Sequence, residues 1–199
     1  MFEEASVVVS PAVTMEESAQ SQQIPGVRAQ IALVPVSAPD EDFLYRTYAS
    51  TRADEMALTG WNPEQQNAFL RMQFNLQTRS YSTDFPEAEY SIIEWNGQPA
   101  GRWIVNRAAD ELLLVDIGLL PEFRGKGIGS ELMNQLMEEA RTTNKSIRLY
   151  VERFNPALAW YDRLGFRAIS EGPVYLEMTW KSGKNDNDLE SQCSKVHSA

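Results

Sequence analysis

Apolar positions recur with two different periods along the chain, and these periods divide residues 27–180 into strands and helices. Short alternating or continuous apolar runs predict strands, whereas apolar residues three or four apart predict helices. The predicted strands are Val27–Pro35, Glu89–Trp95, Pro99–Val105, Leu112–Leu120, Ser146–Val151, Arg167–Ser170 and Val174–Trp180. The predicted helices are Asp40–Leu58, Pro63–Thr78, Ile128–Ala140 and Asn155–Leu164.

Two short signals define local connections. Asn96-Gly97 is typical of the two-residue turn of a β-hairpin, so the strands on either side of it are expected to be antiparallel. Asn62 followed by Pro63 predicts a helix start, because Asn caps the helix and Pro suits its first position. The residues of that helix expected to face the core are Phe69, Met72 and Leu76.

The strand Leu112–Leu120 is apolar almost throughout, as expected of a central strand buried on both faces. Gly118 within it predicts a bulge or a close approach to a ligand. Asp116 is ionisable at a position where an apolar residue is expected, so it must be paired, lie at a strand end or be functional. The following helix and the strand Ser146–Val151 complete a strand–helix–strand unit, which predicts a parallel pair.

Composition and charge exclude several classes of function. A chain of 199 residues with 43% hydrophobic residues fits one domain, and the net charge of −10 argues against nucleic acid as a partner. The lone Cys193 and lone His197 lie in a polar tail, so we expect no disulfide, no His-based catalysis and no metal site. No run is long enough to span a membrane and no signal peptide is evident, so a cytoplasmic location and no membrane partner are expected.

Both ends of the chain have a different composition from the middle. Residues 1–26 are rich in Ser, Gln, Glu and Pro and are expected to form a disordered leader, which leaves Met1 and Met15 open as native starts. Residues 182–199 are polar and are expected to form a disordered tail. The folded domain is therefore expected at residues 27–181.

Candidate chemistry centres on the turn Arg124-Gly125-Lys126-Gly127-Ile128-Gly129, between a predicted strand and a predicted helix. Glycines let the backbone approach a ligand closely, and the helix start directs free N–H groups and a positive dipole end at the same place. Such a turn suits a phosphate or pyrophosphate. Its spacing excludes a Walker A loop and a dinucleotide fingerprint, and it follows antiparallel strands rather than opening a parallel series.

This turn resembles the signature of the GNAT superfamily of acyl-CoA-dependent N-acyltransferases, Gln/Arg-x-x-Gly-x-Gly/Ala between a strand and a helix. A second block of that superfamily is matched by Asn155, Tyr161 and the pair Gly165-Phe166. The order of predicted elements agrees from Val27 to Trp180, as in a bacterial-type single-domain member. The resemblance implies an α/β fold with a mixed sheet of about six to seven strands and about four helices on its two faces.

The resemblance also implies a coenzyme A site. The pyrophosphate would lie on the glycine turn with Arg124, Lys126 and Ser130, and the pantetheine arm would run along the backbone of Ile117–Leu120, which would also supply the oxyanion donor. The residues implied to hold the cofactor are Ile117, Leu119, Leu120, Arg124, Gly125, Lys126, Gly127, Ile128, Gly129, Ser130, Asn155 and Tyr161.

Tyr161 matches the position of the general acid that protonates the leaving thiolate, and Asn155 matches a pantetheine contact. The structural alternatives are that Tyr161 is a core residue and that Asn155 only caps a helix. The amine must lose a proton before it attacks, and without histidine the base would be a carboxylate. The candidates are Asp116, Glu94 and Glu152; Asp116 is equally compatible with an ion pair to Arg102 or Arg148.

The expected activity is transfer of the acetyl group of acetyl-CoA to a primary amine by direct attack in a ternary complex. The acceptor would be a small molecule or a protein or peptide, which the sequence does not identify, and a homodimer is compatible with the family. The alternative is a non-catalytic module of the same fold that binds acyl-CoA as a sensor or interaction domain.

Overall fold

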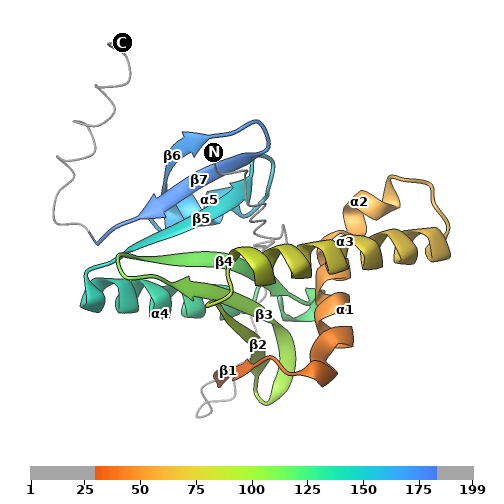
Figure 1. Ribbon diagram of the computed structural model, residues 1–199, viewed down its shortest axis with the longest axis horizontal. Helices are drawn as coiled ribbons and strands as arrows, with labels where there is room; N and C mark the ends of the chain where they lie inside the picture. Colours follow the sequence, from red (N-terminus) through yellow and green to blue (C-terminus); the bar gives the residue numbers. More distant parts are fainter. Residues whose placement is uncertain (1–29, 183–199) are drawn as a thin grey trace.

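The computed structural model describes residues 30–182, and its core is one seven-stranded mixed sheet in the order β1-β2-β3-β4-β5-β7-β6 (Figure 1). The strands are β1 (Ile31–Pro35), β2 (Glu89–Trp95), β3 (Gln98–Arg107), β4 (Glu111–Leu119), β5 (Ser146–Glu152), β6 (Arg167–Glu171) and β7 (Tyr175–Trp180). Only β4 and β5 pair in parallel; all the other neighbouring strands are antiparallel. The leader predicted for residues 1–26, nearly all of the predicted tail, Cys193 and His197 lie outside the described residues.

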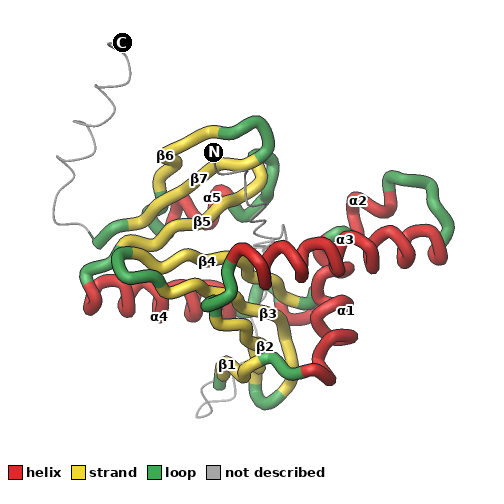
Figure 2. The backbone as a smooth tube through the Cα atoms, in the orientation of Figure 1, coloured by secondary structure: helices red, strands yellow, loops and turns green. Residues whose placement is uncertain are grey.

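Helices cover both faces of the sheet (Figure 2). They are α1 (Glu41–Thr51), α2 (Ala53–Ala57), α3 (Pro63–Asp84), α4 (Ile128–Thr143) and α5 (Leu158–Arg163), with short 3₁₀ turns at η1 (Ala38–Asp40) and η2 (Pro121–Phe123). Residues of α4 and α5 pack in one cluster with Leu112 and Leu114 of β4. Tyr81 of α3 packs on the opposite face against Leu113 and Val115. The α/β fold class and the mixed sheet expected from the sequence are confirmed, with five α-helices instead of about four.

The additional helix arises because the predicted helix Asp40–Leu58 is interrupted at Arg52, which has φ −108° and ψ 6°. The break redirects the chain, so that Met56 of α2 joins Tyr48 of α1 and Leu70 of α3 in a separate apolar cluster. The prediction of one helix was wrong because the spacing of Phe43 to Met56 does not reveal the turn between them.

The predicted inward face of α3 was wrong at Met72 and Leu76, whereas Phe69 is partly buried and packs against the cluster of α1, α2 and α3. Met72 and Leu76 are 48% and 55% exposed, whereas Leu70, Phe74 and Tyr81 are buried, and the helix continues to Asp84. Packing against α1 decides which face turns inward, since the Phe74 ring lies 5.7 Å from that of Tyr45 and 5.8 Å from that of Tyr48. Aromatic pairs at such distances contribute beyond simple burial.

Two local predictions concern backbone turns and bulges. Asn96 and Gly97 have φ of 52° and 75° and join Trp95 to its partner Gln98, which confirms the predicted hairpin. The bulge predicted at Gly118 was wrong: the shift in register lies at Val115, between the pairs Val105–Leu114 and Ile104–Asp116. A bulge of this kind turns side chains onto a different face. It accordingly places Val115 with α3, whereas Ile117 faces the α4 side.

The two facing glycines of β3 and β4 differ in the space around them. A Cβ atom on Gly101 would overlap the carbonyl oxygen of Gly118, whereas one on Gly118 would be 3.5 Å from the nearest atom, a methyl of Thr47. The close approach of β3 to β4 therefore requires glycine at position 101 only.

We predict that Gly101→Ala lowers the free energy of unfolding by about 1–3 kcal/mol, because backbone must move to relieve the overlap. Gly118→Ala is the matched control and is expected to change it by less than about 1 kcal/mol. Urea denaturation of the two variants measures both values. Equal effects of the two substitutions would contradict this account of the strand packing.

Candidate functional site

The site is built where pairing between the two parallel strands stops. β4 and β5 pair at only four positions, from Glu111–Ser146 to Leu114–Leu149, although β4 continues to Leu119 and β5 to Glu152. The bulge at Val115 follows immediately after the last pair, and bulges twist a strand away from its neighbour. We refer to Val115–Leu119, which has no strand partner on this side within residues 30–182, as the open β4 edge.

Backbone groups of the open β4 edge alternate in direction. The Leu120 N–H donates to the Ala100 carbonyl of β3 at 2.9 Å, so in an extended strand Ile117 and Leu119 turn their N–H and C=O groups the other way. The Leu119 carbonyl accepts a hydrogen bond from Arg124 Nε at 3.0 Å. The N–H groups of Ile117 and Leu119 therefore face the side from which a ligand would pair, whereas the N–H of Leu120 does not.

The glycine turn leads from this edge into α4. Gly125 and Gly127 have φ of 69° and 78°, and a Cβ atom on either would meet open space. Gly127 occupies the N-cap without a side-chain cap. The first-turn N–H groups of a helix have no partner within the helix, so those at Ile128, Gly129 and Ser130 remain for another acceptor.

The two cations of the turn have protein partners. Arg124 Nη2 donates to the Ser50 carbonyl and hydroxyl oxygens at 3.1 and 3.2 Å, so this side chain joins α1 to the end of β4. Burial is the main cause that lowers its pKa from the ordinary value of arginine. The Lys126 ammonium lies 4.6 Å from the ring centroid of Trp95, which is within the range of a cation–π contact. The structure thus brings Lys126 toward β2 and Arg124 toward α1.

The helix start also contacts α5. The Ser130 hydroxyl accepts a hydrogen bond from the Trp160 indole at 3.3 Å, and a Cβ atom on Gly129 would lie 3.6 Å from the Trp160 ring. The hydroxyl proton of Ser130 remains available for donation. Asn155 is buried, and its side-chain oxygen accepts from the Ala157 N–H at 2.8 Å. The predicted cap at Asn155 was wrong, because α5 begins only at Leu158 and Ala157 occupies its N-cap.

Tyr161 is completely buried in α5 between the rings of Trp160 and Phe166. Its hydroxyl has no hydrogen-bond partner among the described residues. Burial raises the pKa of Tyr161 well above its ordinary value, and the negative charge of Asp116 raises it further. The phenol is therefore protonated at neutral pH, and an unpaired buried hydroxyl of this kind calls for an explanation.

The three candidate carboxylates occupy different environments. Asp116 is fully buried and forms an ion pair with Arg102, the pairing that the sequence left open, and Arg102 also donates to Gln77 at 3.0 Å. Glu94 lies on β2, two strands away from the open β4 edge. Glu152 is the last residue of β5 and pairs with Arg52 at 3.4 Å. The structure brings Asp116 and Glu152, but not Glu94, to the place where β4 and β5 part.

Sequence analysis did not single out Arg52 or Gln77. Arg52 falls at the break between α1 and α2, and its partner is 100 residues further along the chain. Gln77 lies on the α3 face that the apolar pattern assigned incorrectly. No local signal predicts either contact, because both depend on how the helices cross the sheet.

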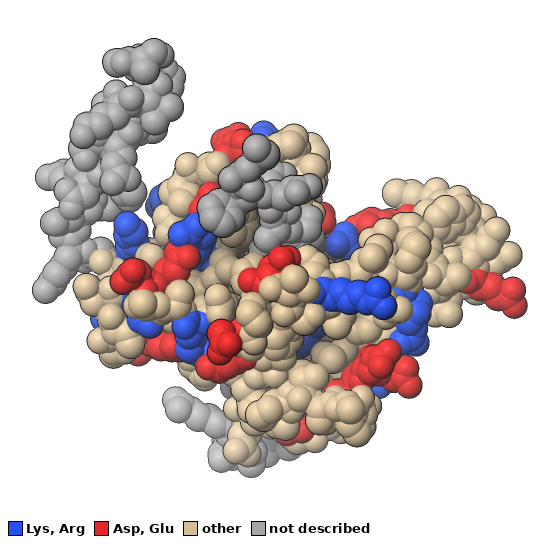
Figure 3. All heavy atoms as spheres, in the orientation of Figure 1, with Lys and Arg blue, Asp and Glu red and all other residues tan. Residues whose placement is uncertain are grey.

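Elsewhere on the surface, charges of both signs are interspersed over the face drawn in Figure 3. Arg107 pairs with Glu89 and Glu139, and Arg148 pairs with Glu111 and Glu177. Partly exposed pairs such as these contribute little to stability individually. Within residues 30–182, no helix combines the length and the apolar character needed to cross a membrane.

The fold and the site together define a class: a mixed sheet in which one parallel pair parts beside a glycine-rich helix start. Two similar solved structures support this fold. The structure of the PaiA N-acetyltransferase of Thermoplasma acidophilum in complex with coenzyme A has a TM-score of 0.58 and 18% identity, over 77% of this chain and 99% of that one. The ribosomal-protein-S18-alanine N-acetyltransferase of Escherichia coli has a TM-score of 0.55 and 18% identity, over 79% and 98%.

The chain belongs to the acetyltransferase (GNAT) family, which it matches over residues 52–166, more than half of its length. It is 30% identical to the 5-NmdU N-acetyltransferase of Pseudomonas phage PaMx11 over 124 residues, which are 55% of this chain and 85% of that protein. It is 36% identical to an uncharacterized N-acetyltransferase of Methanocaldococcus jannaschii over 89 residues, which are 40% of this chain but only 39% of that longer protein. The family predicted from the two motifs is thus confirmed.

Burial of Tyr161 predicts a loss of stability in alkali. Tyrosine in the unfolded chain loses its proton near its ordinary pKa of 10.0, whereas the folded protein retains it to a higher pH. Above pH 10 the folded state therefore binds more protons, and the free energy of unfolding falls as the pH rises. This contribution to the loss of stability grows between pH 10 and 11.

Tyr161→Phe removes that contribution, so its stability should decline less than that of the wild type over this range. Urea denaturation at pH 9, 10 and 11 measures the difference between the two proteins. Parallel profiles would show that the Tyr161 hydroxyl is not held in its neutral form.

Proposed function

We propose that this protein transfers the acetyl group of acetyl-CoA to a primary amine by direct attack in a ternary complex. The observation that carries the proposal is the open β4 edge, with the N–H groups of Ile117 and Leu119 on one side and the buried, unpartnered Tyr161 hydroxyl nearby. Together they supply donors for a thioester and a proton for its leaving group.

The described residues fit coenzyme A as a co-substrate. The positive-φ glycines at 125 and 127 and the N–H groups that follow them suit the pyrophosphate, and Lys126 adds a positive charge close by. The pantetheine arm would pair with the open β4 edge as an additional strand. Arg124 and Asn155 would act in this site by holding the backbone in place. The residues assigned to the cofactor site remain Ile117, Leu119, Leu120, Arg124, Gly125, Lys126, Gly127, Ile128, Gly129, Ser130, Asn155 and Tyr161.

Each step of the reaction has a group that suits it. The amine nitrogen attacks the thioester carbon, and the N–H of Ile117 or Leu119 stabilises the negative charge on its oxygen. The carbon–sulfur bond then breaks, and Tyr161 gives a proton to the thiolate. Burial raises the pKa of Tyr161 and the negative charge of Asp116 raises it further, so Asp116 would support the acid without touching the substrate.

The acceptor is proposed only as a class, a primary amine on a small molecule or on a protein or peptide. Proteins similar to this one are named for acceptors as different as 5-NmdU and the alanine of ribosomal protein S18. The helices α1, α2 and α3 form an apolar cluster separate from the core that contains α4.

Release of free thiol from acetyl-CoA in the presence of spermidine, tyramine or a tetrapeptide with a free N-terminus tests the activity. The wild type is expected to release thiol with at least one of these amines, and Tyr161→Phe about 100-fold more slowly. Binding of coenzyme A by calorimetry without thiol release from any amine would instead favour the non-catalytic acyl-CoA-binding module.

Gly127→Glu is expected to weaken binding of coenzyme A by more than about 100-fold, because a bulky negative charge would stand where the pyrophosphate lies. Gly60→Glu is the matched control, since Gly60 has φ of 68° and open space around it but lies between α2 and α3. Calorimetry with coenzyme A compares the two variants. Unchanged affinity in a folded Gly127→Glu protein would contradict the position of the pyrophosphate.

A further inference from the structure

An internal cation lies at the end of the sheet where β4 and β5 part. Arg52 Nη1 lies 2.9 Å from Glu55 Oε1 and 3.4 Å from Glu152 Oε1, and the Arg52 guanidinium carbon lies 5.9 Å from the ring centroid of Tyr48. Two carboxylates and an aromatic face thus surround one positive charge. The Arg52 side chain is only 14% exposed, and that of Glu152 is 27% exposed.

Glu152 lies at the level of Ile117 in the open β4 edge. The last β4–β5 pair is Leu114–Leu149, and Ile117 and Glu152 each lie three residues beyond it in parallel strands. The bulge at Val115 shifts this correspondence by no more than one residue, to Gly118. Glu152 therefore lies at the same level along the strands as the backbone groups assigned to the thioester, across the opening where β4 and β5 part.

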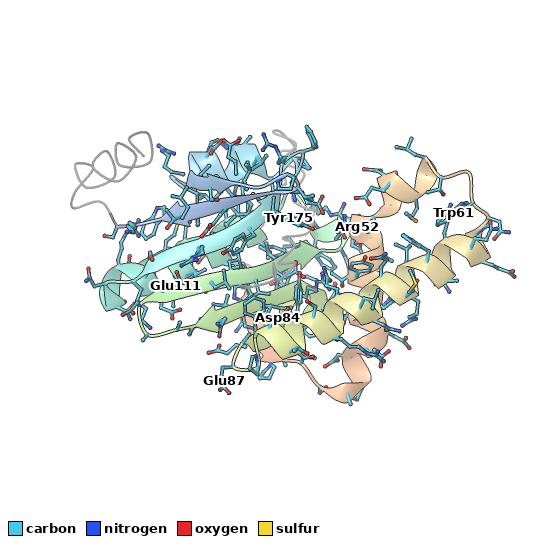
Figure 4. All side chains as sticks on the ribbon, turned by 45° about the horizontal axis from the view of Figure 1, so that its top comes forward. Arg52, Trp61, Asp84, Glu87, Glu111 and Tyr175 are labelled. Carbon is cyan, nitrogen blue, oxygen red and sulfur yellow. The ribbon has the colours of Figure 1, made fainter. Side chains whose placement is uncertain are left out.

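Glu152 and Tyr161 reach this level from opposite faces of the sheet. Ile147, Leu149 and Val151 of β5 face the core shared with α4 and α5, where Tyr161 also lies. Side chains alternate along a strand, so Glu152 faces α1, as its contact with Arg52 requires. Figure 4 shows Arg52 close to Tyr175, which is the β7 partner of Glu152.

We propose that Glu152 binds the ammonium group of the acceptor and takes its proton, and that Arg52 occupies this position until the acceptor displaces it. The proposal rests on the proposed function and specifies its substrate class: a protonated primary amine without a negative charge near the reacting nitrogen. An alkylammonium and a guanidinium are both cationic donors, so carboxylates and an aromatic face that hold one suit the other.

Displacement of Arg52 is physically reasonable. Its contact with Glu152, at 3.4 Å, is longer than a typical charge-assisted hydrogen bond. Arg52 is also the single non-helical residue between α1 and α2, and it keeps a second partner in Glu55 when it leaves Glu152. The other carboxylate at this position, Asp116, is fully buried in its pair with Arg102 and has no such freedom.

The proton balance is complete. The acceptor R–NH₃⁺ transfers one proton to the Glu152 carboxylate and becomes R–NH₂, which forms the new carbon–nitrogen bond. The carbon–sulfur bond breaks, the thiolate receives a proton from Tyr161, and the second proton lost by the nitrogen restores Tyr161. Glu152 then releases its proton to solvent, so the products are the amide, free thiol and one proton.

The test compares steady-state rates of thiol release, with the amine of the above panel that the wild type acetylates fastest. Glu152→Gln should lower kcat/KM for the amine about 100-fold while the affinity for coenzyme A stays unchanged. Glu152→Asp keeps the charge and should retain part of the activity, which separates chemistry from misfolding. The control is Glu177→Gln on neighbouring β7, which removes a similar pair with Arg148 and should change neither value.

Arg52→Gln distinguishes two roles for Arg52. Its side chain either occupies the acceptor site or is only a tether that links α1 to β5. Loss of the competing cation should lower KM for the amine about threefold or more. A tether would give the opposite result, a rise in KM with both Arg52→Gln and Glu152→Gln. Equal kcat/KM in wild type and Glu152→Gln would overturn the role of Glu152 alone, whereas a wild type that acetylates no amine would overturn the proposed function itself.

Discussion

The loss of pairing between β4 and β5 after Leu114 and Leu149 is the constraint on which the rest of the site depends. Backbone N–H groups inside a protein need partners, and the bulge at Val115 leaves those of Ile117 and Leu119 without a neighbouring strand. A ligand that runs beside β4 would satisfy them. The glycine turn follows directly and would hold the far end of the same ligand, so two adjacent backbone features account for one elongated co-substrate.

The two faces of the sheet supply different chemistry to this edge. On the α4 and α5 face, burial keeps the Tyr161 hydroxyl protonated, and no described residue forms a hydrogen bond with it. On the α1 face, Glu152 is partly exposed and pairs with Arg52, its one ion-pair partner within residues 30–182. The buried pair of Asp116 and Arg102 is anchored to Gln77 of α3. In the proposed reaction the acid and the base would thus act from opposite faces of the sheet.

Local patterns were sufficient for the strands, the hairpin at Asn96-Gly97 and the turn at Arg124–Gly129, because each depends on neighbouring residues. Patterns failed where two elements meet. The break at Arg52 and the outward position of Met72 follow from packing between α1 and α3. The bulge lies at Val115, although a glycine, Gly118, is the residue that predicts one. The contact of Arg52 with Glu152 joins residues 100 positions apart, so no local signal predicts it.

The central claim is that the backbone of the open β4 edge, and not only the glycine turn, binds the co-substrate. Hydrogen–deuterium exchange of the Ile117 and Leu119 amides, measured with coenzyme A and with 3′-phospho-ADP, which lacks the pantetheine arm, tests this claim directly. We expect coenzyme A to slow exchange at both amides by about tenfold or more, and 3′-phospho-ADP to slow it only at residues 125–130. Equal protection by the two ligands, or no protection of Ile117 and Leu119 by coenzyme A, would contradict it.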